Sequence, residues 1–535
     1  MRPHPTVLPS STGDDDLASA PSRTRTRTRK AWILRPLLLT FLATFASVSV
    51  AQACTGVAFG GGSGASDAPY VLATPEHFEE LTEHYESLSD TWDPCWSANY
   101  VMAADVDLSG ISWVPIGSDS AYSIKTGFDG KFDGNGHTIT GFTIQSDTAS
   151  DLAFFGQLNG TLRNVTFQNA VVSASDDAAV VATLLGGSLV NVRATGATVN
   201  SNGGAGGLVD ESSGGRLENV AFAGVVDASS GDAGGLAALA TNGTDVVGGL
   251  VDGDIRGTAK VGGAVGNLMG ASMTDVRIRG RVEGQTTNTG EGTGGLVGRI
   301  YLLHASAIQN VLVEADVDGV NNVGGVLGIV QSSLVTPVLR RVQVLADVDG
   351  TQYVGGVVGT MFDGTVRDAA VGGSIAGDTA GGLTGYTTLD AAMVLERGVL
   401  HASMDTNPNN VGAVVGDVNG SNKTFDVSST FVDLSASGVS SAMGSSDQVN
   451  GFDAVSTTEA QTLATYREAG WSIATGDPVI RGDAEATWRL CEGEYPVIAS
   501  VGLPDVCDPV DTGLTFGFEG ASGEILRNVP FDVTV

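Results

Sequence analysis

The sequence has 535 residues, of which 75 are glycine and only 6% are aromatic, and its formal net charge is −33. Glycine is about twice as frequent as usual while the apolar content is ordinary, which excludes collagen and a disordered chain. An acidic surface repels phosphate, so neither nucleic acid nor an anionic membrane is expected as a partner. Two explanations of the acidity stay open: solubility, for example in salty surroundings, and cation binding.

Residues 1–53 have the organisation of a secretory signal peptide. A basic region ends at Arg35, an apolar run extends from Pro36 to Val50, and Ala51-Gln52-Ala53 forms a cleavage site. The run is too short to span a membrane comfortably, so we expect a secreted or cell-surface protein whose mature chain has no transmembrane segment. Cys54 follows the cleavage site directly, which leaves lipid attachment as an alternative, although Ala51 stands where such signals usually carry Leu.

Four cysteines remain after cleavage, namely Cys54, Cys95, Cys491 and Cys507. In an exported protein an even number permits two disulfides. Cys491 and Cys507 are the favoured pair because they are close in the same terminal segment, and Cys54 with Cys95 follows by elimination. No C-x-x-C spacing indicates zinc, and no H-E-x-x-H motif supports a zinc protease.

Residues 54–151 are predicted to form an N-terminal cap and the first strands. We expect a strand from Tyr70 to Ala73, a helix from Pro75 to Leu88 and a strand from Tyr100 to Leu108. Asp-Gly and Asn-Gly pairs between Phe128 and Ile139 alternate with apolar residues, which is typical of tight turns between strands.

Residues 152–424 are organised by a motif, Gly-Gly-x-x-Gly, that returns about every 30 residues, a period typical of repeat architectures. Each unit has three apolar segments. The first is the glycine motif, the second begins at a residue such as Leu189, and the third follows about nine positions later. Constant offsets predict constant corners, and therefore three short strands per coil of an all-β parallel solenoid. About ten coils follow from the first segments at Leu152, Ala178, Gly206, Gly234, Gly262, Gly294, Gly324, Gly355, Gly381 and Val411.

Spacing matters more than the motif itself. Gly248-Gly249 falls in the second segment, because Val246 and Ile255 keep the nine-residue offset. Asparagines in the second segment, at Asn164, Asn191, Asn219 and Asn310, are predicted to form a stacked amide ladder at a corner. Extra residues at Tyr301–Ala305 and Gln331–Pro337 should bulge outward, and loops on one face of a solenoid often bind ligands.

Several motifs in this order resemble bacterial GLUG-motif surface proteins. They are Pro69-Tyr70, the run Tyr100 to Leu108, Trp113-Val-Pro-Ile-Gly117, the run Phe128 to Ile139, and the repeats such as Gly294-Gly295-Leu-Val-Gly298. The resemblance covers about residues 68–500 and implies a right-handed parallel β-helix in an exported protein. GLUG motifs occur in adhesin-like proteins and beside immunoglobulin A peptidases, but the peptidase motif is absent here, so that activity is not implied.

Residues 425–510 are predicted to close the solenoid. We expect a helix from Thr458 to Ala469, and we expect Trp471, Trp488 and Tyr495–Ile498 to cover the open end of the core, as a solenoid requires. Residues 511–535 resemble the first strands of an immunoglobulin-like domain, but about 25 residues cannot form that domain. Either the chain is a fragment, or these strands pack on the solenoid.

Four aspartates form the candidate metal site. Asp316 and Asp318 flank Val317, and Asp347 and Asp349 flank the equivalent Val348 of the next coil. With both valines inward, the carboxylates point outward, about 5 Å apart between coils and about 7 Å along the strand. Ca²⁺, which favours oxygen ligands, would relieve their repulsion. The alternative is a solvated charged edge, and the spacing does not fit an EF-hand.

Arg277, Arg279 and Arg281 form an outward basic stripe, which we expect to pair with Asp254, Glu283 or Asp316 in neighbouring coils. A polysaccharide lyase or hydrolase would need a base and charge-neutralising groups that converge in one groove, whereas the acids here are dispersed. The function we expect is an adhesin or display scaffold that binds glycans or host or envelope surface proteins. No catalytic residue is assigned. The alternative is a carbohydrate-active β-helix enzyme.

Overall fold

The computed structural model describes Cys54 and residues 59–83, 94–117, 127–302, 307–332, 337–362, 364–388, 393–405, 410–419, 424–445, 448–475 and 487–501. All of them belong to one compact unit, Ala51–Val535. The predicted signal peptide and residues 511–535 lie outside the described residues.

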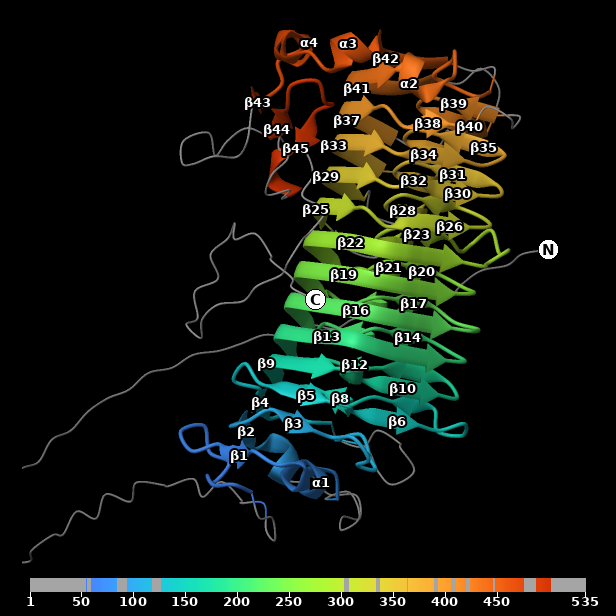
Figure 1. Ribbon diagram of the computed structural model, residues 1–535. Helices are drawn as coiled ribbons and strands as arrows, with labels where there is room; N and C mark the ends of the chain where they lie inside the picture. The colour runs from blue at the N-terminus through green and yellow to red at the C-terminus, as the bar shows by residue number, and fades with distance from the viewer. Residues whose placement is uncertain are drawn as a thin grey trace, which may run out of the picture. The chain divides into compact units, whose positions relative to one another are not determined.

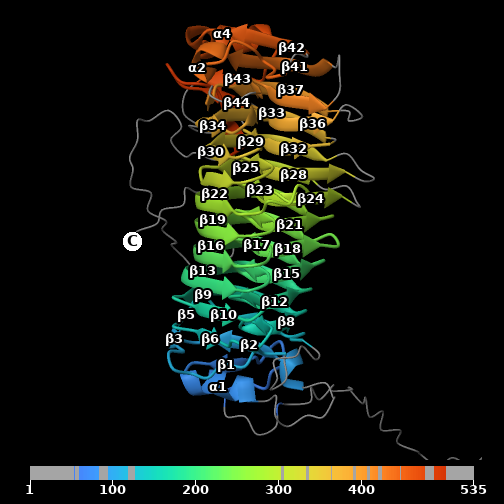
Figure 2. The same cartoon turned by 90° about the vertical axis from the view of Figure 1, so that its right-hand side faces the viewer.

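The described chain is nearly all β and forms a solenoid of stacked parallel coils (Figures 1 and 2). Each repeat coil contributes strands to three parallel sheets. The short-strand sheet contains β7 (Asp151–Leu152), β11 (Asp177–Ala179), β14 (Ala205–Gly206), β17 (Ala233–Gly234), β20 (Val261–Gly262), β23 (Thr293–Gly294), β27 (Val323–Gly324), β31 (Tyr353–Gly355), β35 (Thr379–Gly381) and β39 (Asn410–Gly412).

The middle sheet follows each short strand after two residues. It contains β8 (Phe155–Leu158), β12 (Ala182–Leu185), β15 (Val209–Ser213), β18 (Ala237–Thr241), β21 (Val265–Met269), β24 (Val297–Leu302), β28 (Leu327–Ser332), β32 (Val358–Met361), β36 (Thr384–Thr388) and β40 (Val415–Asn419). The short-strand and middle sheets each have ten strands. The predicted all-β parallel solenoid of about ten coils is therefore confirmed.

The long-strand sheet holds the rest of each coil. Its strands are β9 (Thr161–Gln168), β10 (Val171–Ala174), β13 (Ser188–Ser201), β16 (Arg216–Ala228), β19 (Asp245–Gly257), β22 (Ser272–Gly284), β25 (Ala307–Val313), β26 (Asp316–Gly319), β29 (Val338–Leu345), β30 (Val348–Gly350), β33 (Gly364–Gly372), β34 (Ser374–Ala376), β37 (Met393–Leu400), β38 (Ser403–Met404), β41 (Thr424–Asp433) and β42 (Gln448–Val455). It also receives β1 (Tyr70–Leu72), β2 (Asn99–Met102), β3 (Val106–Asp107), β4 (Lys131–Asp133), β5 (Thr138–Thr140) and β6 (Thr143–Gln145).

The division of each coil into strands differs from the prediction. Two strands flank the glycine motif, because β14 ends at Gly206 and β15 begins at Val209. The second and third predicted segments instead join in one bent strand in four coils, for example β13. The predicted position of Gly248 is confirmed, since it lies inside the long strand β19.

The core runs through the inside of the coils as one continuous cluster of buried apolar residues. Its N-terminal end is covered by α1 (Pro75–Glu83), which confirms the described part of the predicted helix; residues 84–88 lie outside the described residues. Phe78 of α1 is fully buried, and its ring lies 6.1 Å from Phe132 and 6.4 Å from Phe154. A short 3₁₀ helix, η2 (Pro94–Ser97), precedes β2. Aromatic side chains therefore fill the first coils, and smaller aliphatic side chains fill the repeats.

The C-terminal segment packs against the solenoid at a different place from the one predicted. It contains α2 (Leu434–Ser437), α3 (Thr457–Ala460), α4 (Leu463–Glu468), β43 (Ile473–Thr475), β44 (Trp488–Leu490), β45 (Val497–Ile498) and a 3₁₀ helix, η3 (Ala499–Val501). Trp471 and Trp488 pack with Ala370, Val399 and Phe431 in a second apolar cluster.

This second cluster lies on the outer face of the long-strand sheet, because strand alternation turns Ala370 outward while its neighbours Ala369 and Val371 face the core. The prediction that the tryptophans cover the open end is therefore wrong. The last coil is instead closed by β42, with Leu434 and Val439 packed against the core. The single predicted helix is two short helices, and a capping box between Ser456 and Glu459 starts the first.

Candidate binding face

The long strands bend at one backbone position that recurs in every coil. Asn191 has φ +55° and Asn219 has φ +51°, in the left-handed region that Asn and Gly tolerate best. Register aligns ten such residues in one column, which we call the corner column: Asn164, Asn191, Asn219, Gly248, Asp275, Asn310, Arg341, Asp368, Arg397 and Ser429. Gly248, the first residue of the Gly-Gly pair in the second segment, lies in this column, and its left-handed conformation explains why glycine occurs there.

The predicted amide ladder is present in the lower coils. Asn191 Nδ2 donates to Asn164 Oδ1 at 2.9 Å, and Asn164 Nδ2 donates to Asp133 Oδ1 at 3.0 Å. Farther up, the column becomes charged. Arg397 holds both carboxylate oxygens of Asp368, at 2.7 and 3.0 Å, and the Trp488 indole N–H donates to Asp368 at 3.1 Å. The corner column is therefore structural, and its upper part anchors the C-terminal segment.

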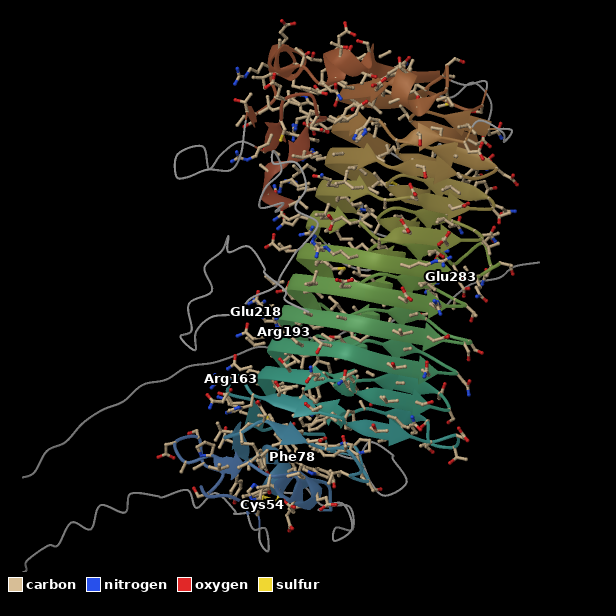
Figure 3. All side chains as sticks on the ribbon, in the orientation of Figure 1. Cys54, Phe78, Arg163, Arg193, Glu218 and Glu283 are labelled. Atoms are coloured by element: carbon tan, nitrogen blue, oxygen red, sulfur yellow. A yellow bond between two sulfur atoms is a disulfide. The ribbon has the colours of Figure 1, made fainter. Side chains whose placement is uncertain are left out.

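Beyond the corner, two outward columns run along the ends of the long strands, and we call them the polar columns. Register assigns Ser173, Asn200, Asp227, Arg256, Glu283, Asp318 and Asp349 to one column, and Asp254, Arg281, Asp316, Asp347 and Ser374 to the other. Seven of these residues are acidic and two are arginines. Figure 3 shows Glu283 at this end of the strands, and Arg163 and Glu218 near their other end.

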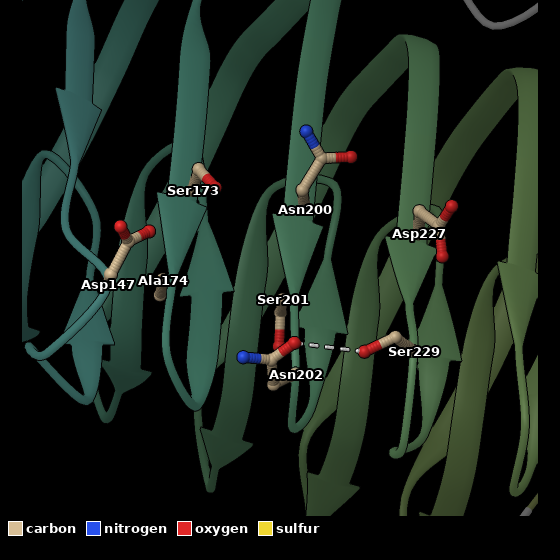
Figure 4. A pocket seen from close by; sticks show the side chains of 8 residues that line it. All are labelled: Asp147, Ser173, Ala174, Asn200, Ser201, Asn202, Asp227 and Ser229. Atoms are coloured by element: carbon tan, nitrogen blue, oxygen red, sulfur yellow. Dashed lines mark hydrogen bonds between the residues drawn. The ribbon is translucent and has the colours of Figure 1, made fainter.

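The lower part of the polar columns borders a groove of about 450 Å³ (Figure 4). Its lining is almost wholly polar and consists of Asp147, Ser173, Ala174, Asn200, Ser201, Asn202, Asp227 and Ser229. These side chains come from four successive coils. One hydrogen bond, from Ser229 Oγ to Asn202 Oδ1 at 3.1 Å, joins two of them. The groove thus offers amides, hydroxyls and carboxylates to a polar ligand that lies along the solenoid.

The four predicted metal-binding aspartates lie in the upper part of the same columns. Register places Asp318 beside Asp349. Asp318 accepts a hydrogen bond from Arg281 Nε at 2.8 Å, and Asp347 Oδ1 accepts from the amide of Ser374 at 3.0 Å. Partial burial, with repulsion from Asp318 and Asp405, raises the pKa of Asp349. Two of the four carboxylates therefore already have partners.

Within the described ranges, no group of three or more His, Cys, Asp or Glu residues is arranged to hold a metal ion. The Ca²⁺ site at Asp316, Asp318, Asp347 and Asp349 stays a prediction. A rise in melting temperature with millimolar Ca²⁺ that is lost when all four aspartates become Asn would support it.

The arginines of the basic stripe are paired, but partly with other acids than expected. Arg281 contacts Asp318 and also Glu283 at 3.8 Å. Arg277 and Arg279 share Glu314, with Nε–Oε2 distances of 2.6 and 3.1 Å. Glu314 precedes the third segment, and only the register of the structure brings it beside the stripe. The pairs with Glu314 and Asp318 cross coils, whereas Glu283 lies in the same strand as Arg281. The pairs do not converge on a groove as a catalytic set would.

The cysteines and the long corners are only partly described. The Cα atoms of Cys54 and Cys95 lie 5.1 Å apart, a separation that a disulfide spans, and we propose that these two cysteines form a disulfide. Cys491 is buried, and its predicted partner Cys507 lies outside the described residues. Most of the corners Tyr301–Ala305 and Gln331–Pro337 do so as well.

Fold and face together define a β-solenoid repeat protein with a long polar surface. Among the helices described here, none is long and apolar enough to cross a membrane. No protein-family model matches the chain.

Comparison with known proteins finds partial similarity. Halomucin from Haloquadratum walsbyi is 32% identical over 159 residues, which make up 28% of this chain and 2% of halomucin. A protein of Evansella cellulosilytica, provisionally named a Gly-rich membrane protein, is 29% identical over 159 residues, 28% of this chain and 17% of that protein. The chain thus spans a small part of either curated relative.

One solved structure is also similar. It is a protein of Bacteroides ovatus, provisionally described as an immunoglobulin A1 protease. Its TM-score is 0.37 at 17% identity, over 82% of this chain and 95% of that one.

Proposed function

We propose that this chain is an exported cell-surface or secreted repeat protein, in which the solenoid presents its polar columns to glycans. The observation that carries the proposal is the groove at Asn200 and Asp227, which continues along the stack as two outward polar columns. Carboxylate and amide oxygens accept hydrogen bonds from sugar hydroxyls, and bonds to a carboxylate are the stronger ones.

The repeat geometry suits a long ligand. Neighbouring coils place equivalent side chains about 4.8 Å apart, so an extended chain of sugars meets a similar set of acceptors at each step. Weak interactions that repeat along one rigid surface can together give a high overall affinity for a long ligand without a deep pocket. The names of the two relatives, halomucin and Gly-rich membrane protein, also fit a surface repeat protein.

The charge of the polar columns determines which class of glycan we expect to bind. Between Asp227 and Asp349 they carry seven carboxylates and two arginines, and both arginines lie against acids of the same columns. A polyanionic glycan would be repelled from such a surface. We therefore expect neutral or amino-containing polysaccharides rather than sulfated or uronic-acid polymers. Attachment to envelope or host proteins is the other outcome that this surface allows.

The test is a screen of the full chain against a glycan array, combined with a polysaccharide cleavage assay. Binding of neutral or amino glycans without release of unsaturated or reducing ends supports the proposal. Release of such ends would establish the carbohydrate-active enzyme instead, and absence of binding to every glycan would remove glycans as the ligand class.

A further inference from the structure

A second group of carboxylates lies where the short-strand and middle sheets meet, a few residues beyond the ends of the long strands. Register stacks Asp151 below Asp177, Asp177 below Gly204, and Gly204 below Asp232. Asp210, the second residue of β15, enters this stack from the middle sheet. Gly204 has no side chain, and the carboxylates of Asp177 and Asp210 occupy the room that it leaves.

Asp210 stands at a position where the later coils carry alanine and then glycine. Its equivalents along the middle sheet are Thr183 and Ala238 in the adjacent coils and then glycine, as at Gly266 and Gly298. A Cβ at Gly298 would lie 2.5 Å from the Val261 amide nitrogen. A side chain here therefore points into the wall of the solenoid, and in Asp210 that side chain is a carboxylate.

The Asp210 carboxylate is buried and only partly satisfied. The residue is 9% exposed, and its Oδ1 atom has no hydrogen-bond partner. A Cβ built on Gly204 would lie 2.6 Å from Asp210 Oδ1 and 3.1 Å from Asp177 Oδ1. The two oxygens are thus at most 5.7 Å apart, the sum of those distances. Asp177 Oδ1 accepts the Gly204 amide at 2.8 Å, and no Lys or Arg contact is seen at either carboxylate among the described residues.

The next coils show how the same stack neutralises an aspartate. Lys260 follows Asp232 in register, and its Nζ lies 2.9 Å from Asp232 Oδ1 and 3.7 Å from Glu291 Oε1. The chain therefore supplies a cation to Asp232, whereas Asp177 and Asp210 face each other over Gly204. An unpaired buried charge costs far more than an exposed one.

We propose that Asp177 and Asp210 hold a hard cation of the Ca²⁺ type in the space beside Gly204. The cation would neutralise their carboxylates, as the Lys260 ammonium neutralises Asp232. Ca²⁺ accepts single carboxylate oxygens and completes its shell with water and carbonyl oxygens. Asp151, Glu211 and Asp232 add negative charge around the site. Burial and these neighbours raise the pKa of Asp210 well above its usual range, so a proton competes with the cation for this carboxylate. The inference does not depend on glycan binding.

The experiment is calorimetric unfolding of the full chain at pH 7, in EDTA and with Ca²⁺ alone added. The melting temperature of the wild type should rise by about 3 °C at a Ca²⁺ concentration a hundred times Kd. Asp210→Asn should abolish this rise, because the amide cannot supply the carboxylate that holds the cation. The variant with Asp316, Asp318, Asp347 and Asp349 changed to Asn should keep the rise, and loss of the rise in this variant would instead assign Ca²⁺ to those four aspartates.

A wild type whose melting temperature does not respond to Ca²⁺ would overturn the inference and leave Asp210 simply protonated. So would an Asp210→Asn protein that keeps the full rise. Asp177→Asn provides the second variant if Asp210→Asn does not fold: it should lower Ca²⁺ affinity at least tenfold in equilibrium dialysis, and unchanged affinity would equally exclude this site.

Discussion

At the scale of single residues, the glycine motif is explained by contact between backbones rather than by flexibility. A Cβ on Gly294 would lie 2.1 Å from the Val297 carbonyl oxygen, and one on Gly295 would lie 2.2 Å from the Gly325 carbonyl oxygen. The third glycine faces the preceding coil in the same way. Each glycine of the motif therefore removes a different backbone clash, and the motif marks the tight corner between the short-strand and middle sheets.

Gly298→Ala tests this explanation. The added methyl group would meet the backbone at Val261 and Gly266, at 2.5 and 2.7 Å, and we expect a loss of about 1–3 kcal/mol of unfolding free energy from overpacking. Gly290→Ala is the matched control, because its Cβ would have no neighbour nearer than 3.5 Å. Urea unfolding followed by circular dichroism measures both. Equal stability of the two variants would contradict the role given to the motif.

Asn191 tests the corner column. Its φ of +55° is costly for a β-branched residue, and its amide also bonds to Asn164. Asn191→Val should therefore lose about 1–2 kcal/mol of stability or more. Asn191→Gly should lose less, because glycine accepts the backbone conformation and forfeits only the hydrogen bond. The order Val below Gly below wild type, in melting temperature, is the expected result, and a Val variant as stable as the Gly variant would show that the corner is not strained.

Some of these residue roles can be predicted from the sequence, and others cannot. The period of the glycines and the offset of Val246 and Ile255 locate every coil, because both follow from spacing along the chain. The pairing of Arg277 with Glu314, the burial of Asp210 and the alignment of Asp368 with Arg397 depend on which residues meet across coils. Because the coils differ in length, spacing along the chain does not show which residues lie side by side in neighbouring coils.

At the scale of elements, the C-terminal segment is a side cover on the long-strand sheet. The Trp488 side chain is fully buried, and Ile498 donates its amide to Gln343 Oε1 at 3.0 Å. The Tyr495 ring stacks on His401 with centroids 3.8 Å apart, and its hydroxyl donates to Asp433 Oδ2 at 2.8 Å. The aromatic composition of this segment indicates that it covers apolar surface. Its location could not be predicted, because Ala370, Val399 and Phe431 look like ordinary strand residues.

His401 gives this cover a pH dependence. Burial lowers the pKa of His401 to about 4, against 6.5 for the free side chain, and Asp433 opposes the change. The contribution of the neutral ring is complete above pH 6.5 and is lost as the pH falls toward 4, at no more than about 1.4 kcal/mol per pH unit. Hydrogen exchange of residues 487–501 should therefore speed up between pH 6.5 and 4.5, relative to β13.

His401→Gln is the control for this prediction, since glutamine cannot titrate. The variant should show the same relative exchange at both pH values after correction for intrinsic rates. A wild-type segment whose protection does not change with pH, or a variant that keeps the wild-type dependence, would show that His401 does not report on the cover.

At the scale of the whole molecule, the solenoid is nearly modular, because each coil contacts mainly its two neighbours. Gly206 and Gly234 hold the same place in successive coils, 28 positions apart. Deleting residues 206–233 should therefore remove one coil, leave a folded solenoid and lower the melting temperature by a few degrees. Deleting residues 206–219 breaks the register and should prevent folding. Circular dichroism distinguishes the two, and similar behaviour of both deletions would contradict a modular solenoid.

The class of fold could be predicted from the sequence because each coil of a repeat fold carries similar residues at a regular spacing along the chain. The function could not be predicted to the same depth. The glycine motif that organises the chain lies in the wall of the solenoid, while the groove at Asn200 and Asp227 is made of ordinary polar residues that only stacking brings together. The predicted aspartates Asp318 and Asp349 do lie on the same outward face, above that groove.

The central claim, that this face binds a glycan along the solenoid axis, is tested most directly by affinity as a function of ligand length. Isothermal titration with a length series of the glycan found by the array should show affinity that rises with length until the ligand spans the groove. Asn200→Ala combined with Asp227→Ala should weaken binding at least tenfold, and Asp252→Ala, outside the polar columns, should leave it unchanged. Length-independent affinity, or full affinity in the double variant, would contradict the account.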